Sequence, residues 1–191
     1  MKSDVIAVSS RTDQTDAVMD QAELVAGYRK LPAKDALHLR LLAEEMMSMM
    51  RAIAGDVDGE FWIENRDKDY ELHLKVQTAM DLFKREKLLA ASTSGKNEAH
   101  RGFMGKIRAL FEPMEDIPIF FTMTDEGIGG DSTWTMHAYQ QQIQTYLDQN
   151  RPGAADAWDE LEKSVVAHIA DDVKVRINGR EVEMTVFKTF V

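Results

Sequence analysis

Apolar positions recur at two periods along the chain, and these periods separate strands from helices. Residues 5–8 form a short apolar run that predicts a strand, and residues 13–28 carry apolar positions at helical spacing. Pro32 ends that helix, and a second helix is predicted from Asp35, its N-cap, to Gly55. The apolar stripe of the second helix consists of Leu39, Leu42, Met46, Met49, Met50 and Ile53.

Strand periodicity then replaces helical periodicity. Residues 61–64 and 70–76 alternate between apolar and polar, and the polar stretch 65–69 between them is typical of a turn. The two runs therefore predict an antiparallel hairpin. Residues 173–177 and 181–187 predict another, because the Asn-Gly pair at positions 178–179 is a strong signal for a tight hairpin turn.

The region between the hairpins is mainly helical in pattern. An apolar, β-prone run occupies residues 117–123, and irregular backbone is predicted at 125–130. Helical spacing occurs in four segments, which are residues 82–91, 98–111, 134–148 and 154–170.

This order of elements predicts an α+β fold. A strand, two helices, a hairpin, further helices and a final hairpin suit a two-layer sandwich, in which a mixed, mostly antiparallel sheet carries helices on one face. The chain has 191 residues, near the usual size of one domain, and it contains no internal repeat. We therefore expect residues 1–191 to form a single domain.

Composition narrows the class of protein. The chain has no cysteine, which excludes disulfides, thiolate metal sites and a cysteine nucleophile and fits a reducing compartment. Its start lacks a signal-peptide pattern and no apolar run reaches membrane-spanning length, so we expect a cytoplasmic protein with no membrane partner. The net charge of −10 argues against nucleic acid as a partner. Residues 81–110 are the exception, with seven Lys or Arg against three Asp or Glu, and they would attract an anionic ligand.

Residues 38–51, with the sequence HLRLLAEEMMSMMR, resemble the signature helix of the GHKL ATP-binding domains of the histidine-kinase type, especially the bacterial anti-sigma factor serine kinases. In that family the helix carries a glutamate and, four residues later, an asparagine on the same face. The resemblance implies that Glu45 is the catalytic glutamate and that Met49 occupies the asparagine position in the nucleotide site. A thioether cannot replace the amide oxygen offered to Mg²⁺, so the resemblance implies ATP as the cofactor but leaves Mg²⁺ without this ligand.

The resemblance assigns further nucleotide contacts to the segment after the first hairpin. Family members carry an Asp-x-Gly motif there, whose aspartate accepts a hydrogen bond from adenine, and Asp81 takes that position without the glycine. A glycine-bearing lid and helix start would hold the phosphates, because glycines permit close approach and helix N-termini favour anions. The residues assigned to this role are Ser94, Gly95, Lys96, Arg101, Gly102, Gly105 and Lys106.

A later segment offers a second match to the adenine motif. Asp125, Gly127 and Gly129 fit the letters Asp-x-Gly-x-Gly, but they follow later than the family order allows, so they are either that motif or a connecting loop. Family members run directly from the lid helix to the last strands. The resemblance therefore implies that residues around 112–157 are a helical insertion within the single domain.

Plainer interpretations stand beside these assignments. The methionines at positions 46, 47, 49 and 50 have the spacing of core-filling residues, and Glu45 lies at the edge of the apolar stripe, which suits a pocket rim or a solvated surface equally. Lys96 and Arg101 could be solvated lid charges. No two of the five histidines have the i, i+4 spacing of a zinc site with a carboxylate partner, so we expect no metal.

The sequence and the resemblance leave two alternative functions, one that depends on ATP binding and one that depends only on a protein partner. The first is an ATP-binding regulatory protein that resembles the anti-sigma factor kinases and, if active, is a serine kinase or ATPase. The second keeps the fold without catalysis and acts as a pseudoenzyme or adaptor through a protein partner. Related anti-sigma factor kinases pair into dimers, so the resemblance also admits a homodimer.

Overall fold

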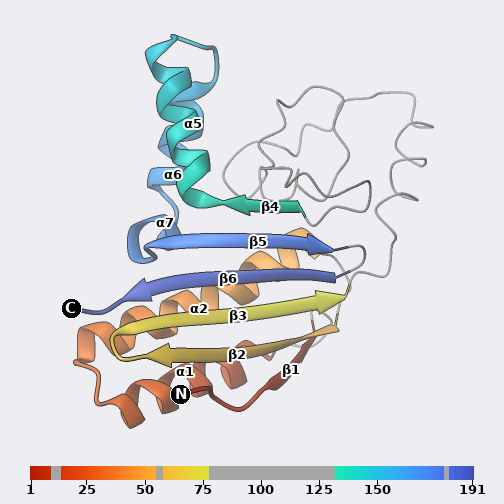
Figure 1. Cartoon of the computed structure of the whole chain (residues 1–191), viewed down its shortest axis with the longest axis vertical. Helices are drawn as coiled ribbons and strands as arrows, with labels where there is room; N and C mark the ends of the chain where they lie inside the picture. Colours follow the sequence, from red (N-terminus) through yellow and green to blue (C-terminus); the bar gives the residue numbers. More distant parts are fainter. Residues whose placement is uncertain (10–13, 55–57, 78–131, 179–180) are drawn as a thin grey trace.

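A computed structural model describes residues 1–9, 14–54, 58–77, 132–178 and 181–191, which form an α+β fold around one six-stranded sheet (Figure 1). The sheet order is β1-β2-β3-β6-β5-β4, and every neighbouring pair is antiparallel. The strands are β1 (Ile6–Ser9), β2 (Asp58–Arg66), β3 (Asp69–Gln77), β4 (Ser132–Thr135), β5 (Asp172–Asn178) and β6 (Glu181–Thr189).

The helices belong to two groups. α1 packs on α2, and both lie behind the sheet in Figure 1, where α1 contacts β2 and α2 contacts β3. α5 and α6 pack on each other and project beyond the β4 edge, while α7 joins this group to α2. The bounds are α1 (Thr15–Arg29), α2 (Ala33–Ala54), α5 (Met136–Asp148), α6 (Ala154–Glu162) and α7 (Val165–Ile169).

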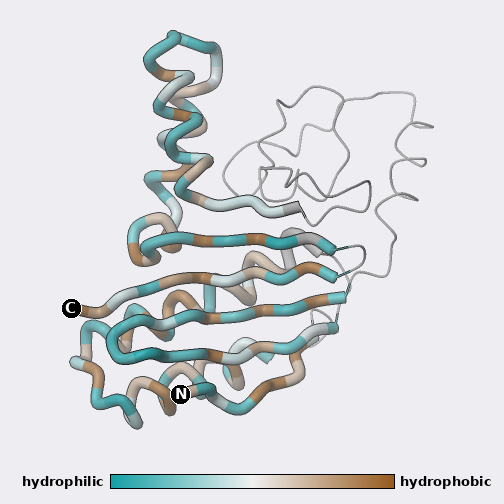
Figure 2. Tube along the Cα trace, viewed as in Figure 1, coloured by the Kyte–Doolittle hydropathy of each residue, from teal (hydrophilic) through white to brown (hydrophobic). Residues whose placement is uncertain are grey.

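Strand alternation gives the sheet one apolar and one polar face. Phe61 and Ile63 of β2 are fully buried, and the register places them opposite Leu74 and Leu72 of β3. The row continues through Val186 of β6 on the same face, because pairing residues of adjacent strands point to one side. The apolar stripe of α2 covers this face and forms the core with it. Figure 2 shows hydrophobic positions recurring along the strands and along α2.

Most elements predicted from periodicity are confirmed in the described ranges. The first strand, the first two helices and both hairpins occur within a few residues of their predicted bounds. The predictions for residues 82–91, 98–111, 117–123 and 125–130 lie outside the described residues.

Three predictions were wrong in detail. The sheet was expected to be mixed, but all neighbouring pairs of the six described strands are antiparallel. Residues 134–148 were expected to be one helix, but Trp134 belongs to β4, where it pairs with Val175, and α5 begins only at Met136. The Thr135 hydroxyl caps that helix by accepting a hydrogen bond from the Ala138 N–H at 3.2 Å. The helix expected over residues 154–170 is interrupted, because the Ser164 hydroxyl accepts from the Ala167 N–H at 3.4 Å and starts α7.

Gly59 of β2 gives a stability test of this packing. A Cβ at this position would lie 2.5 Å from the Lys75 carbonyl oxygen and 2.7 Å from Cγ1 of Val76. Overpacking of this kind typically costs about 1–3 kcal/mol, so we expect Gly59→Ala to lower the free energy of unfolding by that amount in urea denaturation. The control is Gly27→Ala in α1, where nothing lies within 4 Å. That variant should gain about 0.4–1 kcal/mol, and equal stability of the two variants would contradict the packing at Gly59.

Candidate functional site

Glu45 is the one predicted catalytic residue, and the structure places it on α2. The helix buries Leu42 and Met46 against the sheet, and this leaves Glu45 half-buried at the edge of the buried stripe. Burial, and secondarily the neighbouring charge of Glu44, raises the pKa of Glu45 above its ordinary value of 4.5. A raised pKa moves a carboxyl group towards the range that suits a general base near neutral pH.

Met49 lies one turn further along α2, inside the core. Its side chain has no exposed surface, and Met46, Met47 and Met50 are buried with it. The expectation that these methionines fill the core is therefore confirmed. Position 49 offers only a buried thioether, and Mg²⁺ prefers oxygen ligands.

The other predicted nucleotide-binding residues lie outside the described residues, so their assignment stays a prediction. They are Asp81, Ser94, Gly95, Lys96, Arg101, Gly102, Gly105 and Lys106, and the alternative motif of Asp125, Gly127 and Gly129 falls in the same segment.

A polar row that the sequence pattern alone did not reveal crosses the opposite face of the sheet. Trp62 of β2 pairs with His73 of β3, which pairs with Thr185 of β6, which in turn pairs with Lys174 of β5. Paired residues share a face, so these four side chains form one line. The available signal was the alternation within β2, since Trp62 must lie on the face opposite Phe61 and Ile63.

The centre of this row is closely packed. The rings of Trp62 and His73 stack with centroids 4.8 Å apart and planes inclined by 4°. The Lys2 ammonium lies 4.5 Å from the centroid of the Trp62 ring, a cation–π contact. Trp62 Nε1–H donates to Glu64 at 3.0 Å, and this hydrogen bond is the main reason that the pKa of Glu64 is lowered. Trp62 is thus held by two contacts to its ring and by a hydrogen bond at its nitrogen.

Acidic groups surround the His73 imidazole. Its Nδ1 lies 3.3 Å from the Thr185 hydroxyl and 3.6 Å from a carboxylate oxygen of Glu183. Its Nε2 lies 3.3 Å from a Glu71 carboxylate oxygen, but the angles do not make a hydrogen bond. Within the ranges described by the structure, no group of three or more His, Cys, Asp or Glu side chains is placed to hold a metal ion. These contacts order the polar face of the sheet around His73.

Glu45→Gln tests whether the ionised carboxyl group of Glu45 lowers the stability of the fold. The pKa of Glu45 is higher in the folded than in the unfolded state, which means that the fold favours the protonated carboxyl group. The contribution of Glu45 to stability is therefore greatest below its unfolded pKa, and it is lost as the pH rises through its folded pKa. Glutamine imitates the protonated form. The free energy of unfolding of the variant should equal that of the wild type below about pH 4. At pH 7 it should be higher by less than about 1 kcal/mol, because the group is partly solvated. Urea denaturation at both pH values measures this, and a less stable variant at pH 7 would contradict it.

No protein-family model matches the chain, and no curated protein matches it significantly. Over the described segments, none of the helices combines the length and apolar character needed to cross a membrane.

Proposed function

We propose that the chain is an ATP-binding regulatory domain with a two-layer, histidine-kinase-type fold, and that it does not perform Mg²⁺-dependent phosphoryl transfer through position 49. The observation that carries the proposal is the arrangement of α2. This helix presents a partly desolvated glutamate at its edge and buries a methionine one turn later. In the family that residues 38–51 resemble, these two positions hold the catalytic glutamate and a metal-binding asparagine.

The element order supports the same proposal. A strand, two helices covering one face of the sheet, a hairpin, and a closing hairpin after further helices follow the order that the resemblance implies. The segment expected to contact phosphate follows directly after β3, and it carries the concentrated positive charge of the chain. An anionic nucleotide is the ligand that this charge distribution favours.

A non-catalytic adaptor is the second candidate, and the burial of Met49 favours it. A domain that had lost both metal-dependent catalysis and nucleotide binding would keep this fold and act only through a protein partner. The two candidates differ in one property, which is whether ATP binds to the native chain.

The melting temperature with and without excess ATP separates the candidates. A ligand that binds only the native state stabilises it by about 2.7 kcal/mol at about 100 times its dissociation constant. For a domain of this size we expect a rise of roughly 5–10 °C. The rise should persist when EDTA replaces Mg²⁺. No rise at millimolar ATP would favour the adaptor.

A further inference from the structure

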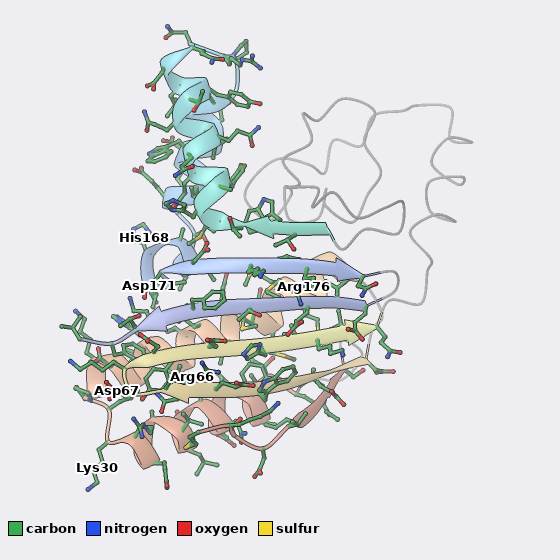
Figure 3. All side chains as sticks on the ribbon, in the orientation of Figure 1. Lys30, Arg66, Asp67, His168, Asp171 and Arg176 are labelled. Carbon is green, nitrogen blue, oxygen red and sulfur yellow. The ribbon has the colours of Figure 1, made fainter. Side chains whose placement is uncertain are left out.

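Asn178 combines an exposed side chain with a particular neighbour in the sequence. It is the last residue of β5, and the residue after it is Gly179. Figure 3 marks this end of β5 by Arg176, on the opposite side of the sheet from His168 of α7. Asn178 is the one asparagine of the chain that precedes a glycine. This pair has a chemistry of its own, which the proposed function does not use.

The sheet holds Asn178 on one side only. Its pairing partner is Glu181 of β6, whereas the described residues of β4 pair with β5 only as far as Ile177. Within the described ranges, no hydrogen bond holds the side-chain amide of Asn178. The amide can therefore turn towards the backbone of the residue that follows it.

The two other asparagines in the described ranges are internal controls. Asn65 is 3% exposed, and its amide donates to two carbonyl oxygens at the β2–β3 turn, at 2.8 and 3.3 Å. Asn150 is exposed like Asn178, but the residue after it is Arg151. Asn65 therefore controls for burial and hydrogen bonding, and Asn150 controls for the side chain of the following residue.

We infer that Asn178 is a site of spontaneous deamidation. The backbone nitrogen of Gly179 attacks the side-chain amide carbon of Asn178, a C–N bond forms, and the amide nitrogen leaves as ammonia with the proton of the attacking nitrogen. Water then opens the resulting succinimide at one of its two carbonyl carbons, which gives aspartate or isoaspartate. The covalent bond between the two residues places the nitrogen within reach, and glycine has no side chain to hinder the attack.

Deamidation adds a negative charge at the end of β5. The register places position 178 opposite Glu181, whose carboxylate pairs with the Lys75 ammonium at 2.9 Å. Like charges directly opposite each other on a sheet destabilise the pair of strands. The isoaspartate product also lengthens the main chain, because the backbone then passes through the former side-chain carbons. Both products therefore weaken the pairing of β5 with β6 at this end.

Peptide mass mapping of the folded protein, incubated at mildly alkaline pH, measures the reaction, because the attacking nitrogen must lose its proton. The peptide that contains Asn178 should gain the mass by which a hydroxyl exceeds an amino group, while Asn65 and Asn150 keep their amides. Isoaspartyl methyltransferase should label the same peptide. Gly179→Ala should slow the reaction about tenfold, a barrier increase of about 1.4 kcal/mol. Equal rates at Asn178 and Asn150 would overturn the inference.

The chain unfolded in urea is the reference for protection by the fold. An amide at Asn178 that is lost in urea but retained in the folded protein would also overturn the inference. Asn178→Asp is the aspartate product made directly, and its melting temperature should lie about 1–4 °C below that of the uncharged control Asn178→Gln. Equal melting temperatures of these two variants would contradict the effect on the pairing with Glu181. None of these results depends on whether ATP binds.

Discussion

Met49→Asn is expected to lower the free energy of unfolding by about 3–5 kcal/mol, since it removes buried apolar volume and places an amide in the core. The side chain of Met49 has no exposed surface, and its neighbours along the α2 stripe are apolar. An amide at this position would lose its hydrogen bonds to water. Placing the asparagine of the GHKL pattern at position 49 would therefore weaken the fold.

Urea denaturation followed by circular dichroism measures this effect. The matched control is Met49→Leu, which keeps the volume and the apolar character and should cost less than about 1.5 kcal/mol. The opposite result is equally clear. A Met49→Asn variant with wild-type stability and new Mg²⁺-dependent ATP hydrolysis would mean that position 49 faces the ligand, and it would contradict the placement of this residue in the core.

Phe190→Ala is expected to lower the free energy of unfolding by a similar amount, about 3–5 kcal/mol. Phe190 follows β6 and is 4% exposed, and its ring packs against Tyr70 at 5.1 Å with the planes inclined by 67°. Its backbone N–H donates to the Lys68 carbonyl oxygen at 3.0 Å. The end of the chain is thereby fixed to the β2–β3 turn, and removal of the ring leaves a cavity beneath Tyr70.

The neighbouring residue provides the control for this prediction. Val191 is fully exposed, so Val191→Ala should change stability by less than about 0.5 kcal/mol. The midpoints of thermal unfolding of the two variants should differ by roughly 6–12 °C for a difference of about 3 kcal/mol in a domain of this size. Equal midpoints would mean that Phe190 does not pack on Tyr70 in solution.

Sequence patterns correctly predicted the helices and strands whose structure depends on residues close to them in the sequence. The stripe of α2 and the alternation of β2 and β3 are local, and the β2–β3 hairpin has a short turn with polar residues. The predictions failed where a distant partner decides the structure. The helical pattern of residues 134–148 was expected to include Trp134, but the pairing of this residue with Val175 of β5 holds it in a strand. No pattern within residues 134–148 reports that partner.

The same distinction between local patterns and distant partners applies to Glu45 and Met49 on α2 and to the polar row on the sheet. Periodicity placed Glu45 at the edge of the α2 stripe and Met49 within it, and the structure agrees on both positions. The polar row on the open face depends on contacts between segments far apart in sequence, because His73 and Thr185 are 112 positions apart. Only the register of β3 with β6 brings these two side chains together. That register is set by the packing of the whole sheet, which a single sequence does not display.

Calorimetric titration of the chain with ATP, in Mg²⁺ and then in EDTA, tests the central claim most directly. We predict saturable binding of one ATP per chain, with dissociation constants in Mg²⁺ and EDTA that agree within about threefold, a difference of less than about 1 kcal/mol. This is the behaviour expected of a nucleotide site whose metal-binding position is a buried methionine. Absence of binding at millimolar ATP, or binding that disappears when Mg²⁺ is chelated, would contradict the proposal.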